Sequence, residues 1–169
     1  RREFIKWASA GAGVATLAGC ATAGSGSGSA GRVVVIGGGY GGATAAKFIK
    51  LWAPDIDVTL VEPNENFVSC PISNLVIGGN AQMSQITFSY DGLRSTWGVK
   101  LLQDTVVGLD AGARKLTLAS GGVLGYDRLV LSPGIEFMFD QTPGLETEDA
   151  RRSVLHAWKA GEQTVALRK

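Results

Sequence analysis

The amino-acid sequence predicts an α/β domain built on a parallel β-sheet, with a small antiparallel β-meander beside it. Three observations lead to this fold class. A run of β-branched residues at 32–36 enters a glycine-rich turn, a helix-forming stretch and a second apolar strand follow, and several short strand-like stretches fill residues 98–134. Strands separated by helices indicate a parallel sheet, and closely spaced strands joined by glycine turns indicate a meander.

The first strand leads directly into a dinucleotide-binding motif. Residues 32–36 read Arg-Val-Val-Val-Ile, a pattern typical of a strand buried on both faces of a sheet. The GxGxxG spacing then falls on Gly37, Gly39 and Gly42, with Tyr40 inside the turn. In this motif the first glycine permits a tight turn, the second lets the backbone approach a diphosphate, and the third lets the helix pack on the strand.

The elements that follow are in the order that the motif requires. A helix is expected over residues 43–51, with its positive amino-terminal end toward the diphosphate, and Pro54 should end it. A second strand at 58–61 stops at Glu62, whose carboxylate can accept hydrogen bonds from ribose hydroxyls. A glycine-rich surface turn is the alternative explanation for a lone GxGxxG, and the ordered set of elements argues against it.

The later strands favour FAD over NAD. Strands are expected at 98–102 and 105–110. A further strand at 115–118, followed by a glycine turn at 121–122, predicts the meander. The segment 126–134, Tyr-Asp-Arg-Leu-Val-Leu-Ser-Pro-Gly, predicts a buried strand and a glycine turn. This order resembles the two-dinucleotide-binding-domain flavoproteins, which bind FAD through a Rossmann-like domain.

That resemblance assigns roles to three residues. It implies that the backbone of Val106 meets the adenine and that Ser132 and Gly134 lie in a turn near the diphosphate. Asp127, in the same final segment, is either a turn residue that caps a strand or a residue with a flavin role, and the sequence leaves both open.

Cys70 is the candidate reactive residue. The disulfide-reductase branch of these flavoproteins has a CxxxxC pair here, whereas residues 69–75 contain one thiol. The strings 61–79 and 156–164 resemble the flavin subunits of flavocytochrome c sulfide dehydrogenases. The resemblance implies FAD contacts from Glu62, Pro63 and Asn64, and a thioether from Cys70 to the flavin. A buried packing cysteine is the alternative.

The reaction implied by this resemblance is the oxidation of a small inorganic sulfur compound, sulfide, with electrons passing through FAD to a c-type cytochrome subunit. Because no CxxCH motif occurs, the haem is expected on a partner subunit. The catalytic thiols are expected beyond Lys169, and no metal site is predicted. The alternatives are a sulfide:quinone or NAD(P)H-dependent reductase of the same superfamily, or a non-catalytic flavin-bearing electron-transfer module.

His156 is the only histidine of the chain, and Trp158 follows two residues later. We expect packing and stacking on a helix surface for His156 rather than catalysis. Trp97, Tyr90 and the stretch 137–139 are expected in a core or an interface.

The amino-terminal residues resemble a twin-arginine export signal. Arg1-Arg2 precede an uncharged, mildly apolar stretch at 7–23 and a Gly/Ser linker. That stretch is less apolar than a membrane-spanning helix, so export to the periplasm without a stable membrane span is expected. Residues 21–23 fit a cleavage site, whereas 17–20 resemble a lipobox with a lipid anchor on Cys20.

The chain is expected to consist of three parts, and its overall charge is nearly balanced. Residues 1–30 are expected to form the leader and linker, 31–150 an incomplete FAD-binding domain, and 151–169 the start of a helix that leads to a second dinucleotide-like domain. The net charge is +1, and the first thirty residues contribute +2 of it. A nearly neutral body without a basic stripe excludes nucleic acid as the expected partner.

Overall fold

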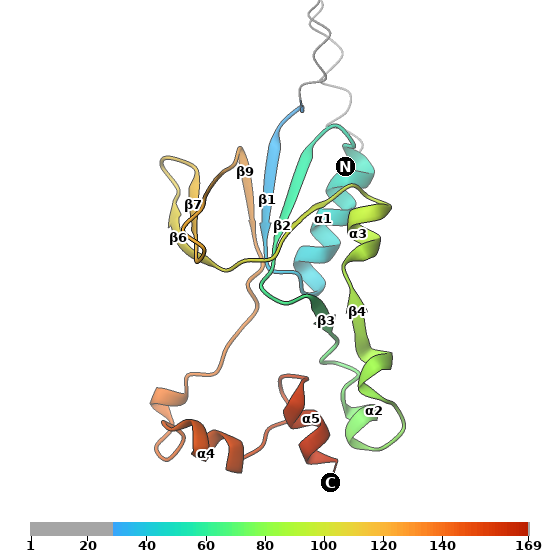
Figure 1. Ribbon diagram of the computed structural model, residues 1–169, viewed down its shortest axis with the longest axis vertical. Helices are drawn as coiled ribbons and strands as arrows, with labels where there is room; N and C mark the ends of the chain where they lie inside the picture. Colours follow the sequence, from blue (N-terminus) through green and yellow to red (C-terminus); the bar gives the residue numbers. More distant parts are fainter. Residues whose placement is uncertain (1–28, 169) are drawn as a thin grey trace, which may run out of the picture.

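The computed structural model describes residues 29–168, and a four-stranded parallel sheet forms its centre (Figure 1). The strand order is β5-β2-β1-β9, and the bounds are β1 (Arg32–Ile36), β2 (Asp57–Val61), β5 (Lys100–Leu102) and β9 (Arg128–Leu131). In register, Val35 lies opposite Leu60 on one side and Val130 on the other. The predicted α/β class with a Rossmann-like parallel sheet is confirmed.

Strand β1 is buried from both sides, which explains its unbroken apolar sequence. Val33 and Val35 pack in a cluster with Ala46 of helix α1 (Tyr40–Trp52). Val34 points the other way, into a cluster with Leu116. Successive side chains of a strand face opposite sides, so a strand between two layers needs apolar residues throughout.

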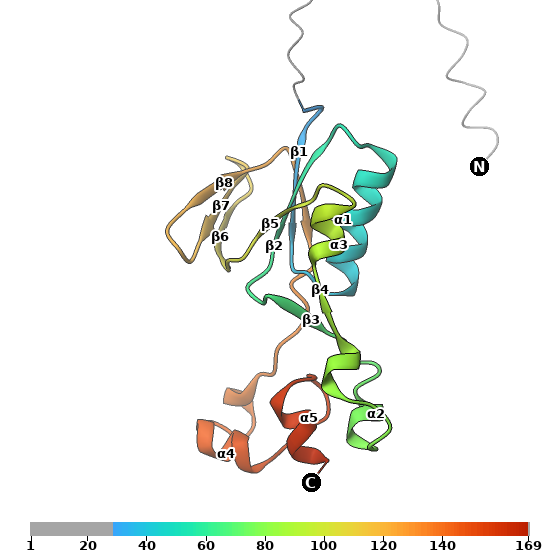
Figure 2. The ribbon, with the colours of Figure 1, turned by 45° about the vertical axis from the view of Figure 1, so that its right-hand side comes forward.

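The two layers that cover the sheet are different. Helices α1 and α3 (Asp91–Ser95) lie on one face, and the antiparallel meander β6-β7-β8 lies on the other (Figures 1 and 2). Its strands are β6 (Val106–Asp110), β7 (Lys115–Leu118) and β8 (Val123–Gly125). The predicted meander is therefore present.

Helix α1 begins three residues earlier than the sequence prediction, which placed it at 43–51. Gly39 is the residue before its first turn, and the helix starts at Tyr40, so the glycine motif itself supplies that turn. The helix ends at Trp52, just before Pro54, as expected.

A hairpin that the sequence analysis did not predict projects from the end of β2. It pairs β3 (Asn66–Val68) with β4 (Thr87–Ser89), and between them lie α2 (Asn74–Ile77) and a short 3₁₀ helix (Met83–Ile86). Tyr90 follows β4 at the end of the hairpin next to the sheet, and Cys70 follows β3 at the end away from it.

The last part of the chain lies beyond the carboxyl ends of the parallel strands. It contains a 3₁₀ turn (Phe139–Gln141), α4 (Glu148–Ser153) and α5 (Glu162–Leu167). Residues 154–161 between α4 and α5 are not helical. The helix expected to start within 151–169 is thus present only as α5, with the end of α4 before it. In both views α5 lies beside α2, against which it packs (Figures 1 and 2).

Candidate functional site

A cavity of about 530 Å³ lies at the carboxyl-terminal edge of the parallel sheet. Most of the predicted site residues line it, from the turns that follow β1, β2 and β9 and from the hairpin: Gly37, Gly39, Tyr40, Glu62, Asn64, Cys70, Ser132 and Gly134. This edge of an α/β sheet is where ligands usually bind.

The glycine turn has the close approaches that its motif requires. A Cβ atom on Gly37 would lie 2.0 Å from the Ser132 carbonyl oxygen, and one on Gly42 would lie 1.8 Å from the Gly37 carbonyl oxygen. Gly37 also has a φ of 91°, which side chains rarely permit. A Cβ on Gly39 would meet nothing within 4 Å, so the turn is closed at its ends and open to a ligand in its middle.

Glu62 is fixed beside this turn by donors on both of its oxygens. Oε2 accepts a hydrogen bond from the Gly38 N–H at 2.7 Å, and Oε1 accepts from the Asn64 N–H at 2.9 Å and from Asn64 Nδ2 at 2.5 Å. An ionised carboxylate has about four acceptor positions, so capacity remains for a ligand hydroxyl. The geometry therefore suits the ribose contact that the strand-end position predicts.

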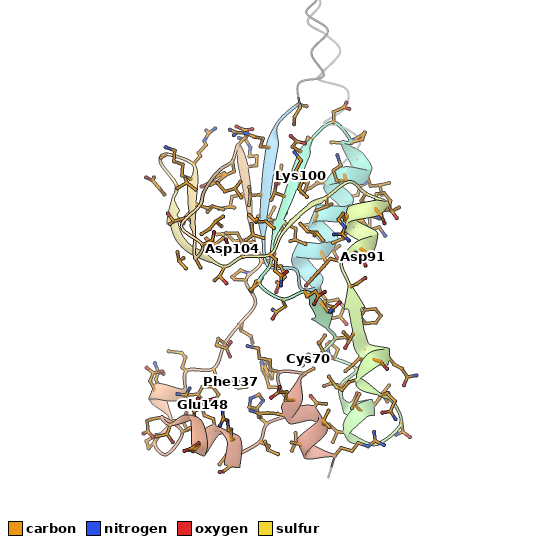
Figure 3. The ribbon with its side chains drawn as sticks, in the orientation of Figure 1. Cys70, Asp91, Lys100, Asp104, Phe137 and Glu148 are labelled. Atoms are coloured by element: carbon orange, nitrogen blue, oxygen red, sulfur yellow. The ribbon has the colours of Figure 1, made fainter. Side chains whose placement is uncertain are left out.

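Cys70 is a half-buried free thiol on the opposite side of the cavity from the sheet (Figure 3). Its backbone is held by neighbours: the Ser69 N–H donates to the Ile86 carbonyl at 2.8 Å, and the Cys70 carbonyl accepts from the Ser73 N–H at 2.9 Å. The hydroxyls of Ser69 and Tyr40 lie 2.5 Å apart. The Cys70 thiol donates to the carbonyl of Trp158. The hairpin thus presents Sγ to the cavity from a fixed turn.

The far wall comes from the last part of the chain, which the sequence analysis did not place at the site. Ile135, Trp158, Lys159 and Ala160 line the cavity. Lys159 Nζ lies 2.5 Å from Glu136 Oε2, and this hydrogen bond is the main reason why the pKa of the Glu136 carboxyl is lowered. The string 156–164 carried a sequence signal, because the family resemblance included it.

Tyr90 also lines the cavity, although it was expected only in a core or an interface. It is 8% exposed, and its hydroxyl donates to the Gly38 carbonyl at 3.1 Å. No sequence signal pointed to this bond, because the two residues are separated by 52 positions.

Three of the predicted site residues do not line the cavity. Gly42 is buried inside the turn, where it permits the packing of α1. Pro63 is exposed, and its carbonyl accepts from Gln103 Nε2 at 3.3 Å. Val106 packs against the buried cluster beneath the meander. The contact of Val106 with adenine stays a prediction.

Asp127 lies at the other end of the sheet. Its carboxylate accepts from the Arg32 N–H at 2.7 Å, at the start of β1, and this bond is the largest cause of a lowered Asp127 pKa. Of the two roles left open by the sequence, this position favours the structural one.

His156 packs rather than lining the cavity. Its ring centroid lies 4.4 Å from that of Phe137, and its Nδ1 is buried without a hydrogen-bond partner within residues 29–168. The stacking agrees with the expectation, but the helix surface was wrong: His156 lies in the non-helical stretch between α4 and α5.

Residues 29–168 contain neither a cluster of metal-binding side chains nor a helix that could span a membrane. The leader, with Arg1, Arg2 and Cys20, lies outside the described residues, as does Lys169.

Comparison with known proteins gives a consistent set of relatives. A family model described as pyridine nucleotide-disulphide oxidoreductase matches residues 31–165. A sulfide dehydrogenase [flavocytochrome c] flavoprotein chain from Chlorobaculum thiosulfatiphilum is 60% identical over 45 residues, which cover 27% of this chain and 94% of that one. The mitochondrial sulfide:quinone oxidoreductase of Mus musculus is 32% identical over 119 residues, 68% of this chain and 25% of the relative.

Solved structures agree on the fold. The sulfide:quinone oxidoreductase from Aquifex aeolicus superposes with a TM-score of 0.67 at 26% identity, over 81% of this chain and 30% of that one. Apart from the short Chlorobaculum sequence, the chain spans between a quarter and a third of the length of these relatives.

Proposed function

The chain belongs to the pyridine nucleotide-disulphide oxidoreductase family, and we propose that it is the FAD-binding part of an exported flavoprotein that oxidises sulfide and passes electrons to a c-type cytochrome subunit. One observation carries the proposal. The glycine turn, Glu62 and the single thiol Cys70 line the same cavity. A glycine turn of this type and a thiol beside one cavity are what a covalently attached flavin would require, and this supports the proposal.

The residues present fit FAD. At the open middle of the turn, the first N–H groups of α1 have no partner within the helix and can bind the diphosphate. Glu62, with Pro63 and Asn64 beside it, would hold the ribose. Ser132 and Gly134 would close the cavity near the diphosphate, and Val106 would meet the adenine.

Cys70 would hold the flavin through a thioether. A thiolate is a strong nucleophile, and the thiol already has an acceptor in the Trp158 carbonyl, which orients Sγ. The chemistry that FAD would supply at this site is the conversion of a two-electron oxidation of sulfide into single-electron transfers to a haem. The residues around Cys70 contain no second thiol for a local disulfide, so the disulfide that would accept the sulfur is proposed between cysteines beyond Lys169.

The relatives support the sulfide branch. The Chlorobaculum match is 60% identical and is named as a flavocytochrome c sulfide dehydrogenase flavoprotein chain. The second candidate function is a sulfide:quinone oxidoreductase, favoured by the Mus musculus and Aquifex aeolicus proteins. Both candidates oxidise sulfide and differ in the acceptor.

Acid precipitation tests the covalent bond. The intact protein, precipitated in acid and washed, should keep its yellow colour, and the peptide that contains Cys70 should carry the mass of FAD. Cys70→Ser should release the flavin under the same treatment and still bind it in the native state. Free release of flavin from the parent protein would make Cys70 a packing residue.

The electron acceptor is tested separately. With sulfide as donor, the intact protein together with its haem subunit should reduce a c-type cytochrome. Reduction of a soluble quinone without reduction of the cytochrome would establish the second candidate instead. Flavin that sulfide cannot reduce would leave a non-catalytic electron-transfer module.

Export is proposed from the leader alone. Arg1→Lys with Arg2→Lys should trap the precursor in the cytoplasm, and an unchanged periplasmic yield would contradict twin-arginine transport. Mass spectrometry of the mature amino terminus would distinguish cleavage after Ala23 from lipidation of Cys20. We also propose that the chain divides at residues 30 and 150 into the leader with its linker, the FAD-binding domain and the segment that follows it.

A further inference from the structure

We propose that Tyr90 is a positioning residue for the bound dinucleotide: its hydroxyl and the Glu62 carboxylate hold the two polar groups of Gly38 and thereby fix the glycine turn. The inference rests on the dinucleotide binding proposed above and is independent of the sulfide chemistry. It adds a residue from outside the GxGxxG motif to the site.

Both backbone polar groups of Gly38 are hydrogen-bonded to side chains from distant parts of the chain. Its N–H donates to Glu62 Oε2 at 2.7 Å, and its carbonyl accepts from the Tyr90 hydroxyl at 3.1 Å. Gly38 is buried, so its polar groups depend on these partners. Two bonds from opposite ends leave this residue little freedom to rotate. The turn that precedes the free N–H groups of α1 is therefore held in one conformation.

The tyrosine ring also accounts for the glycine at position 38. The GxGxxG spacing requires glycine at 37, 39 and 42 but leaves position 38 free. A Cβ atom on Gly38 would lie 2.5 Å from the Tyr90 hydroxyl oxygen and 2.7 Å from Cζ of the ring. The tyrosine ring thus occupies the space of a side chain at 38. Tyr90 explains a glycine for which the motif gives no reason.

The Tyr90 hydroxyl keeps its proton and can therefore donate. Burial first, and the nearby Glu62 charge second, raise the pKa of Tyr90 to about 12. The hydroxyl is therefore protonated at every physiological pH and remains a donor. A buried hydroxyl with a buried acceptor makes a bond that phenylalanine cannot replace.

Tyr90 belongs to the same hairpin as Cys70. It directly follows β4, whose partner strand β3 leads to Cys70. One hairpin therefore carries both the proposed flavin-attachment residue and the residue that fixes the glycine turn. The two ends of the proposed cofactor site are held at a set separation by a single element.

Tyr90→Phe tests the inference, in the intact protein carrying Cys70→Ser so that FAD can dissociate. We expect the dissociation constant of FAD to rise roughly three- to tenfold, as for the loss of one hydrogen bond to a buried acceptor. The ³¹P resonances of the bound diphosphate should shift, because the turn is no longer fixed. A role in packing alone would leave both unchanged, since the ring remains.

Tyr126→Phe is the matched control. Tyr126 is equally buried, at 8% exposure, but packs in the cluster on the meander side of the sheet. It should leave FAD affinity and the ³¹P spectrum unchanged. Equal affinities and spectra for Tyr90→Phe and the parent would overturn the inference. A parent protein that binds no FAD would overturn the proposed function as well.

A double-mutant cycle tests the contact between residues 38 and 90. Gly38→Ala should weaken FAD binding, because the new Cβ displaces the tyrosine ring. In a Tyr90→Ala background the same change should cost much less, because the ring is gone. Equal losses in both backgrounds would contradict the proposed contact.

Discussion

The sheet region, residues 31–134 with the hairpin, and the segment 135–168 each form a wall of one cavity but are stabilised in different ways. The sheet region contains two buried apolar clusters, centred on Val35 and Val34. Among the described residues of the later segment, Thr164 alone is buried. The first wall is thus built on a core of its own, whereas the second has none.

The later segment is held by individual contacts. The Arg151 guanidinium lies 4.4 Å from the ring centroid of Phe139, and Arg151 Nε donates to the Leu145 carbonyl at 2.8 Å. Its links to the rest of the site include the packing of α5 on α2 and the bond from the Cys70 thiol to the Trp158 carbonyl. We infer that the sheet region fixes the dinucleotide turn in advance, and that the later segment depends on what the cavity holds.

A core substitution should give the largest difference between the two regions. Leu60 is fully buried, so Leu60→Ala should lower the free energy of unfolding by about 2–5 kcal/mol. Val154→Ala, at a residue 57% exposed in the later segment, should change it by less than about 0.5 kcal/mol. Urea unfolding measures both. Equal effects would mean that the later segment contributes a core of its own.

Loss of the strand-end acid should affect both walls. Glu62→Ala removes a charged acceptor and should weaken non-covalent FAD binding by about 1.5–3 kcal/mol for each ribose bond lost. The later segment should then become more sensitive to limited proteolysis, while the sheet region stays protected. Glu65→Ala, an exposed neighbour, is the control. Unchanged flavin content and loading rate would make Glu62 a strand-end residue without a cofactor role.

High pH should weaken the sheet region through Tyr90. The pKa of Tyr90 in the folded state, about 12, lies above the ordinary value near 10. The stabilisation that its protonated hydroxyl provides is therefore complete below about pH 10. It should be lost progressively as the pH rises toward 12. Urea midpoints measured across this range should fall less steeply in Tyr90→Phe than in the parent. Parallel curves would contradict a raised pKa.

The smallest effect is expected from acid on the later segment. Hydrogen bonding to Lys159 lowers the pKa of Glu136, so the stabilisation is present above the ordinary carboxyl pKa and is lost as the pH falls through the folded-state value. Both side chains are more than half exposed, which limits the contribution to about 1 kcal/mol or less. Glu136→Gln should abolish the acid-dependent increase in proteolysis of residues 135–168. Its persistence would assign the increase to other groups.

Most of the parallel sheet and its site could be predicted from local sequence. The buried strand, the glycine spacing and Glu62 follow one another within about thirty residues, so period and motif were sufficient. The β3-β4 hairpin was not predicted, because strands of three residues have no recognisable period and pair across a long insertion. The far wall with Trp158 and Lys159 was missed for a similar reason, since residues distant in sequence meet only in the folded chain.

The sequence by itself determined the fold class, the position of the dinucleotide turn and the choice of Cys70 as the reactive candidate, because each depends on residues that are close neighbours along the chain. Only the tertiary structure decided that Asp127 ties two strand starts together, that Cys70 faces the Trp158 carbonyl, and that Tyr90 holds Gly38. Each of these contacts joins residues more than fifty positions apart. Local patterns carry no information on such pairs, since the packing of sheet, hairpin and later segment brings them together.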